Sequence, residues 1–156
     1  MTRTFVAKGL EIAQLDLQQI LLRGKGDGSF ADTVNKEVSL LPPTDNLRII
    51  INDEFLFARQ SFDQWSLVCL KLKPEKEISR LVAAFNFNEE ILASDYSNMT
   101  YFQITGENKN HYLSKLTHFD LRPKKFPVST MAQTLIARIE CCLYNLEDKY
   151  LLSCHS

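Results

Sequence analysis

The feature that most constrains the fold is a run of apolar residues near the end of the sequence. Thr130 and Gln133 occupy the first and last positions of a helix capping box at its start. The apolar residues that follow recur at helical spacing over five turns: Met131, Leu135, Ile139, Cys142, Leu143, Leu146 and Tyr150. The pattern predicts an amphipathic helix from about Thr130 to Leu152, with Leu135 on its buried side and Ile136 off the stripe.

A chain of 156 residues is the size of one ordinary domain. A domain of this length buries roughly 70% of the surface of its unfolded chain, enough for a core without metal or disulfide support. We therefore expect a single domain over residues 1–156. Two parts of it should be irregular, namely a flexible glycine-rich loop at 24–33 and a mobile tail at 153–156.

Two further segments have helical spacing. From Leu10 to Leu22 most apolar residues follow a helical stripe, although Ile12 and Leu15 lie off it. After Pro74, a residue suited to a helix start, the apolar residues from Ile78 to Phe85 are spaced as on one helix face. These patterns predict an N-terminal helix and a middle helix.

Strand signals lie between these helices. A short strand is expected at Val38–Leu41, before Pro42 and Pro43. Leu47–Ile51 and Glu54–Ala58 flank Asn52-Asp53, which suits a two-residue hairpin turn. Trp65–Leu72 is rich in strand-forming residues and ends before Pro74. We expect the strands at Leu47–Ile51, Glu54–Ala58 and Trp65–Leu72 to form an antiparallel meander.

A second hairpin is expected to pair Tyr101–Thr105 with His111–Leu116, across a turn-rich segment at 106–110. A short helix within residues 107–120 is the alternative. The predicted fold class is thus α+β: an antiparallel sheet, made of the meander and the hairpin, packed by an N-terminal, a middle and a long C-terminal helix.

Charge and targeting signals favour a cytoplasmic protein. Eighteen basic and nineteen acidic side chains leave a net charge of −1, so the whole molecule does not attract nucleic acid or anionic lipid. Four unevenly spaced cysteines indicate reduced thiols rather than a secreted disulfide framework. No signal peptide or membrane span is visible. Export by a route that reads no N-terminal signal remains an alternative.

No motif indicates a metal or a cofactor. Cys141 and Cys142 are adjacent, and adjacent helical positions point about 100° apart, which does not suit one ion. Cys154-His155 has no partner at metal-ligand spacing. The glycines from Gly24 to Gly28 lack the Gly-Lys-Ser/Thr ending of a phosphate-binding loop.

The candidates for acid–base catalysis are His118, Asp120 and His111. His118 and Asp120 would point to one side of an extended strand, as a histidine base and its orienting carboxylate require. No nucleophile in a signature context accompanies them. A solvated histidine is the favoured interpretation for His118 and His111.

The candidate binding residues are Arg122, Lys124, Lys125, Ile136 and Trp65. The three cations lie between prolines beside Phe126, where they could contact phosphates or an acidic protein. Ile136 and Trp65, with the segment Phe55-Leu-Phe57, could leave an apolar patch for a protein partner or a second copy of the chain.

These observations favour a non-enzymatic interaction module, such as an adaptor, a small chaperone or an immunity-type protein, which binds a partner or forms a homodimer. The first alternative is a small enzyme with an acid–base site around His118 and Asp120. The second is a weak nucleic-acid binder that uses Arg122–Lys125, which the balanced charge disfavours.

Overall fold

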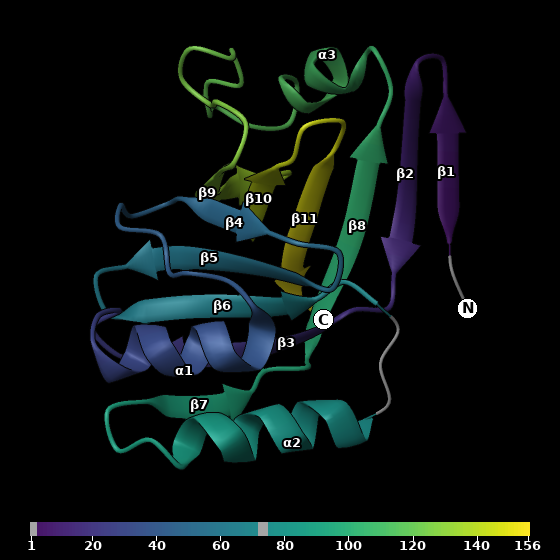
Figure 1. The fold of residues 1–156 in the computed structure, drawn as a ribbon. Helices are drawn as coiled ribbons and strands as arrows, with labels where there is room; N and C mark the ends of the chain where they lie inside the picture. Colours follow the sequence, from purple (N-terminus) through teal and green to yellow (C-terminus); the bar gives the residue numbers. More distant parts are fainter. Residues whose placement is uncertain (1–2, 72–74) are drawn as a thin grey trace. The chain divides into compact units, whose positions relative to one another are not determined.

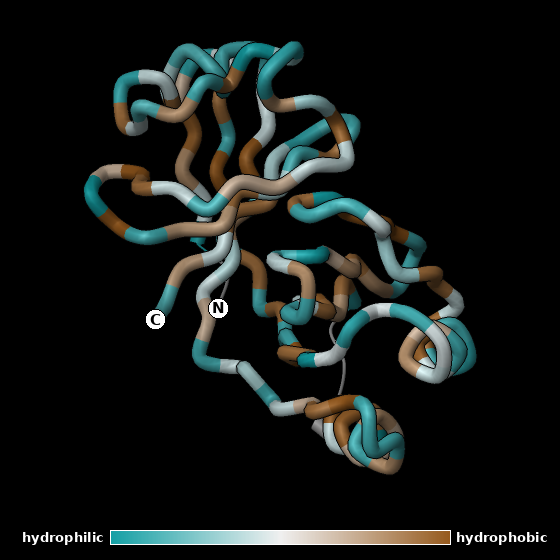
Figure 2. The backbone as a smooth tube through the Cα atoms, turned by 90° about the vertical axis from the view of Figure 1, so that its left-hand side faces the viewer, coloured by the Kyte–Doolittle hydropathy of each residue, from teal (hydrophilic) through white to brown (hydrophobic). Residues whose placement is uncertain are grey.

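The computed structural model describes residues 3–71 and 75–156, which contain eleven strands and three helices (Figure 1). The chain divides into two compact units. Unit 1 combines residues 1–16 with residues 98–156, and unit 2 is residues 17–97. Figure 2 shows apolar stretches recurring along the strands, with hydrophilic segments in several of the loops between them.

Unit 1 is built on an antiparallel sheet with the strand order β1-β2-β8-β11-β10-β9. A short helix, α3 (Lys109–Leu113), follows β8. The strands are β1 (Thr4–Ala7), β2 (Leu10–Leu15), β8 (Met99–Thr105), β9 (Thr130–Ile136), β10 (Ile139–Asn145) and β11 (Tyr150–His155).

The core of unit 1 lies on one face of this sheet. Leu143 from β10 and Tyr150 from β11 pack there with Leu121 and Phe126 from the segment between α3 and β9. The Asn145 side chain donates a hydrogen bond to the Phe126 carbonyl over 2.8 Å, which fixes that segment to the sheet. A loop without regular structure thus supplies part of the core.

Unit 2 is a second antiparallel sheet, with the order β4-β5-β6-β3-β7, and two helices that pack on one face of it. The helices are α1 (Ser29–Val38) and α2 (Glu75–Asn86). The strands are β3 (Gln18–Arg23), β4 (Ile49–Ile51), β5 (Phe55–Ser61), β6 (Gln64–Cys69) and β7 (Leu92–Asp95).

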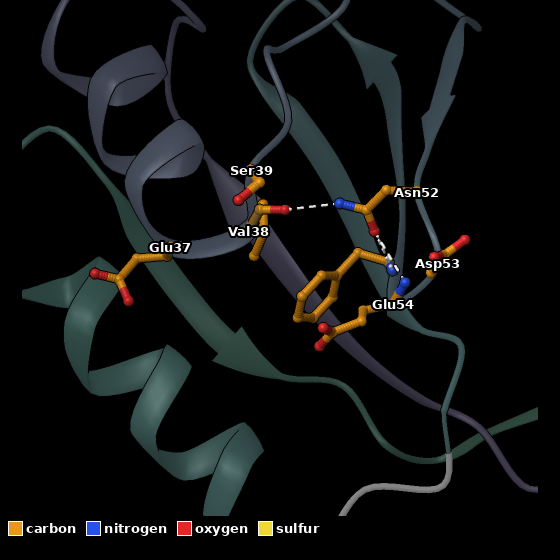
Figure 3. Close-up of a pocket in the computed structure, with 7 residues that line it drawn as sticks. Glu37, Val38, Ser39, Asn52, Asp53 and Glu54 are labelled. Atoms are coloured by element: carbon orange, nitrogen blue, oxygen red, sulfur yellow. Dashed lines mark hydrogen bonds between the residues drawn. The ribbon is translucent and has the colours of Figure 1, made fainter.

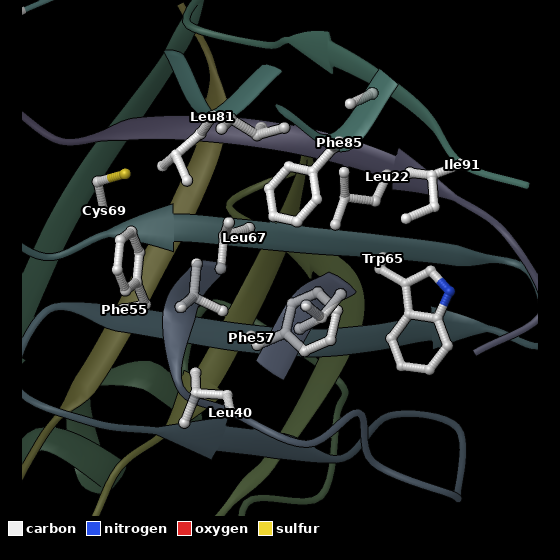
Figure 4. Close-up of a cluster of buried hydrophobic side chains, with 14 of the residues drawn as sticks. Leu22, Leu40, Phe55, Phe57, Trp65, Leu67, Cys69, Leu81, Phe85 and Ile91 are labelled. Carbon is white, nitrogen blue, oxygen red and sulfur yellow. The ribbon is translucent and has the colours of Figure 1, made fainter. Parts of the chain in front are cut away.

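Trp65 belongs to the unit 2 core and has no exposed surface (Figure 4). Its ring stacks on Phe57 at 5.2 Å and contacts Phe30 of α1 at 5.2 Å. The indole N–H donates to the Gly24 carbonyl over 3.0 Å. A side chain at Gly26, which has a φ of +89°, would collide with the Trp65 ring, so the glycine-rich segment closes over the indole.

The predicted C-terminal helix is wrong. Residues 130–155 form the three strands β9, β10 and β11. Ala137 and Arg138 both have positive φ and make the tight turn between β9 and β10, and the Leu146 amide donates to the Lys149 carbonyl at the turn between β10 and β11. The β-branched and aromatic residues of this segment favour strands, and apolar residues on both faces of a strand can imitate a helical stripe.

The helix prediction places Leu135 in the core and Ile136 at the surface, and the structure shows the reverse. Ile136 is 7% exposed and belongs to the unit 1 core, whereas Leu135 is 54% exposed. The reason is the two-residue period of β9, in which neighbouring side chains point to opposite faces. The expected surface role of Ile136 is therefore replaced by a core role, and the same holds for the buried Trp65.

The predicted N-terminal helix is also wrong. Residues 10–23 form β2 and β3, which belong to the two different units. Ile12 and Leu15, the residues that did not fit the helical stripe, were the sign of a strand. The predicted loop at 24–33 is shorter than expected because α1 begins at Ser29, and the predicted mobile tail is part of β11 as far as His155.

Other predictions of local structure fare better. The middle helix is confirmed as α2, and the meander is confirmed as β4, β5 and β6. The turn between β4 and β5 lies one position later than expected, at Asp53 and Glu54, because the Asn52 amide donates a hydrogen bond to the Phe55 carbonyl. Leu72 and Pro74, the predicted end of the third strand, lie outside the described residues.

Two short segments differ from their predictions. The predicted second hairpin is replaced by its alternative, the short helix α3, because β8 pairs with β2 and β11 instead. The expected strand at Val38–Leu41 is absent from the described residues, since Val38 ends α1 and Ser39 caps it in a left-handed conformation.

Candidate functional site

A hollow of about 300 Å³ lies in unit 2 where the end of α1 meets the turn between β4 and β5 (Figure 3). This volume is at the small end of the range for ligand pockets. Side chains with carboxylate, amide and hydroxyl groups dominate its lining, which consists of Glu37, Val38, Ser39, Asn52, Asp53, Glu54 and Phe55.

Asn52 fixes the shape of this hollow. Its side-chain oxygen accepts hydrogen bonds from the amides of Glu54 and Phe55 over 2.9 and 2.8 Å, and its side-chain nitrogen donates to the Val38 carbonyl over 2.9 Å. One asparagine thus holds the turn and joins it to the last carbonyl of α1. Ser39, with a φ of 59°, ends the helix at the same point.

The hollow has an acidic rim formed by Glu37, Asp53 and Glu54. Arg80 of α2 lies beside it and bonds to Glu37 over 3.1 Å and to Glu77 over 2.9 Å. Hydrogen bonds to these two carboxylates, that to Glu77 first, raise the pKa of Arg80 above its usual value. Arg80 therefore offsets the charge of Glu37, one of the three carboxylates of the rim.

The structure places the three acid–base candidates in unit 1, outside this hollow. His111 is an exposed residue of α3, and His118 is exposed in the segment that follows. The Asp120 carboxylate accepts hydrogen bonds from the Arg122 guanidinium at 2.6 and 2.9 Å. Arg122 is therefore the residue that orients this carboxylate. An acid–base role for the three residues stays a prediction.

Arg122 also changes the acidity of Asp120. Hydrogen bonds from the Arg122 side chain, and secondarily from its amide, lower the pKa of Asp120 to about 2. Such a carboxylate is a weak base at neutral pH. Of the three candidate cations, Arg122 is thus paired with Asp120. Lys124 and Lys125 are exposed.

We expect the Asp120 carboxylate to titrate in the folded protein with a midpoint near pH 2. Because the folded pKa is lowered, the ion pair is fully formed above the ordinary aspartate pKa and is lost as the pH falls through the folded value. Carbon-detected NMR of the carboxyl group checks this. Arg122→Gln should move the midpoint up toward 3.8, whereas the control Lys124→Gln should leave it unchanged. A midpoint that Arg122→Gln does not move would contradict the assignment.

No pattern in the sequence indicates the hollow. The sequence predicts Asn52 and Asp53 only as turn residues, and it does not predict α1, the helix that contains Glu37. No described helix is both long enough and apolar enough to cross a membrane. Within residues 3–71 and 75–156, no group of three or more metal-ligating side chains is placed to hold an ion.

No protein-family model and no curated protein sequence matches the chain. Solved structures do match in fold. One is a chain of heterotetrameric sarcosine oxidase from Corynebacterium sp. U-96, in a complex with pyrrole 2-carboxylate. It has a TM-score of 0.82 and 17% identity, over 97% of this chain and 79% of that one.

A second structural match is aminomethyltransferase T of the glycine cleavage system from Bartonella henselae. Its TM-score is 0.68 at 9% identity, over 95% of this chain and only 42% of that one. At these identities the likeness establishes the fold alone. It overturns the expectation of a purely non-enzymatic interaction module, because the fold is one that occurs in chains of two enzymes.

Proposed function

We propose that this chain is a subunit of a hetero-oligomeric enzyme that oxidises an N-methylated amino acid such as sarcosine. The observation that carries the proposal is the extent of the structural match. Almost the whole chain superimposes on about four-fifths of one chain of a heterotetrameric sarcosine oxidase. The aminomethyltransferase extends well beyond the match, so the oxidase chain is the better guide to the role of a protein of this size.

The reactions of the sarcosine oxidase and of the aminomethyltransferase support chemistry at a carbon bonded to nitrogen. Sarcosine is N-methylglycine, and an aminomethyltransferase moves a carbon atom bonded to an amine nitrogen. Both enzymes therefore act at a carbon attached to nitrogen. An oxidase of this kind takes two electrons from the substrate and passes them to oxygen, which supplies a measurable activity.

A free sheet edge in unit 1 supports the role of a subunit. β1 is the outer strand, and the Gln14 amide of β2 donates to the Arg3 carbonyl. Backbone groups alternate in direction along a strand, so those of Thr4 and Val6 point away from β2. Phe5 and Val6 are 58% and 69% exposed. An edge with open hydrogen-bonding groups and exposed apolar side chains suits a protein partner.

The proposed partner at this edge is another subunit of the same enzyme, and the proposed location is the cytoplasm, in keeping with four cysteines present as thiols. Self-association through the edge is the competing arrangement. It predicts a symmetric dimer of this chain alone.

The test is to purify the tagged chain from its own organism at its natural level and to measure oxygen uptake. Addition of sarcosine should produce oxygen consumption by the purified assembly, with the chain as a component. Val6→Lys should reduce the recovered activity at least tenfold, because a charge replaces the exposed apolar contact. Thr4→Lys is the matched control, with the same charge on the same face of β1, and should retain most of the activity.

A tagged chain that is recovered alone, or with partners that consume no oxygen with sarcosine or other N-methylated amino acids, would contradict the proposal. Activity retained in Val6→Lys would show that the subunit contact does not use this edge of β1.

A further inference from the structure

Two cysteines of unit 1 lie directly opposite each other on neighbouring strands. The strands β10 and β11 lie side by side (Figure 1). Cys141 of β10 pairs with Cys154 of β11, next to the pair Cys142 and Ser153. Side chains of directly opposed residues project to the same face of a sheet. Cys141 is a member of the unit 1 core and Cys154 packs against that core, so both thiols lie on the same side.

The position of this pair in the hydrogen-bonding pattern brings the two strands close. The Leu146 amide of the β10–β11 turn donates toward β11, to Lys149, whereas the Asn145 carbonyl accepts from Ser129 on the opposite side of β10. Because directions alternate, Cys141 also bonds away from β11. Residues opposed in this manner have Cα atoms about 4.5 Å apart, within the range that a disulfide can span.

The two thiols interact with each other and differ in their surroundings. The Cys141 thiol is 8% exposed and donates to the Ile139 carbonyl over 3.3 Å. Burial first, and then the adjacent Cys154 and Cys142 thiols, raise the pKa of Cys141 to about 11. Cys154 is only partly buried. Cys154 is therefore the more accessible member of the pair. Cys141 is the buried member, and its raised pKa keeps it a protonated thiol at neutral pH.

We propose that Cys141 and Cys154 form a reversible oxidation site, in which hydrogen peroxide converts the two thiols into a cross-strand disulfide. The Cys154 thiolate attacks one peroxide oxygen, the O–O bond breaks, and Cys154 becomes a sulfenic acid with release of one water. The Cys141 sulfur then attacks the Cys154 sulfur and displaces the hydroxyl group, which leaves as a second water with the Cys141 proton. Two thiols give up two electrons, and one peroxide is reduced to two waters.

Hydrogen peroxide is the product expected of an oxidase that passes two electrons to oxygen, so the proposed function would supply the oxidant. The inference itself rests on the geometry of β10 and β11 and is tested on the isolated chain. Failure of one proposal therefore leaves the other intact.

Cys142 supplies the matched control. It neighbours Cys141 in sequence but lies opposite Ser153, and alternate residues of a strand face opposite sides. A disulfide that follows the strand register should need Cys154 and Cys141 and should not need Cys142.

The experiment treats the purified full-length chain with hydrogen peroxide and measures its intact mass and its disulfide-linked peptides. We expect the loss of two hydrogen atoms per chain, a linked peptide pair containing Cys141 and Cys154, and full reversal by dithiothreitol. The disulfide should raise the melting temperature by about 5 °C, because it closes the hairpin in the unfolded chain. Cys142→Ser should behave as the unmodified chain does, and Cys154→Ser should form no disulfide within one chain.

A disulfide that involves Cys142 or Cys69, or oxygen addition at Cys154 without a disulfide, would overturn the proposal. So would an intramolecular disulfide that survives Cys154→Ser. Circular dichroism of each variant confirms that the comparison is made between folded proteins.

Discussion

Replacing Ile136 by asparagine is expected to lower the free energy of unfolding by about 3 kcal/mol, enough to unfold a chain of marginal stability. Ile136 is 7% exposed and packs in the unit 1 core with Leu143 and Cys141. The substitution removes buried apolar surface and places a polar amide in an apolar core. The lost packing and the cost of desolvating the amide both lower the free energy of unfolding. Urea unfolding followed by circular dichroism gives the magnitude.

Leu135→Asn is the matched control for this prediction. Leu135 is the preceding residue of β9 and is 54% exposed, so the same change should cost less than about 1 kcal/mol. Asparagine rather than aspartate is chosen because Leu135 lies opposite Glu140, which would repel a second carboxylate. If Leu135→Asn proves the more destabilising of the two, residues 130–136 present the opposite face to the core.

Trp65→Ala is expected to cost about 4 kcal/mol, the second large effect. The substitution removes a fully buried indole, its stacking on Phe57 and its contact with Phe30. It also leaves the Gly24 carbonyl without the indole donor and the Arg59 guanidinium without the ring that lies 4.6 Å from it. The loss should appear as a lower urea midpoint.

Two variants separate these contributions. Trp65→Phe keeps an aromatic ring but loses the N–H donor, so it should lie between the unmodified chain and Trp65→Ala. Phe62→Ala removes an aromatic ring that is 64% exposed, two residues before β6 begins, and should change stability by less than about 1 kcal/mol. A cost for Trp65→Ala no greater than that for Phe62→Ala would contradict the burial of Trp65 in the unit 2 core.

The parts of the fold that were predictable are those in which local sequence and tertiary structure agree. The apolar face from Ile78 to Phe85 can be satisfied only by a helix, and α2 is that helix. The two strands around Asn52 and Asp53 have a turn between them that suits a hairpin, and β4 and β5 follow. Even there the turn was misplaced by one residue, because Asn52 uses its side chain to hold the turn that follows it.

The errors arose in segments where apolar residues occur at several spacings at once. In residues 130–155 the apolar positions fit a helical period of 3.6 residues, yet the chain forms strands with a period of two. Ala137 and Arg138, the turn residues between β9 and β10, include no glycine or asparagine to mark a break. With no such mark in the sequence, a helix that crosses the turn was the simpler interpretation.

The candidate site was not predictable for a different reason. Its lining comes from the end of α1 and from the turn after β4. No pattern in the sequence indicates that these two segments lie next to each other. The hydrogen bond from the Asn52 side chain to the Val38 carbonyl joins these two segments in the folded structure, across 14 positions of the sequence. The cysteine pair was missed likewise, since Cys141 and Cys154 become neighbours through the register of β10 and β11.

Native mass spectrometry of the complex purified through the tagged chain is the sharpest test of the proposal that this chain is a subunit of an oxidase assembly. We expect one discrete assembly that contains this chain in a fixed whole-number ratio to at least one different polypeptide. That assembly should be the species that consumes oxygen with sarcosine. A chain found only as a monomer, or only in multiples of itself, would contradict the claim.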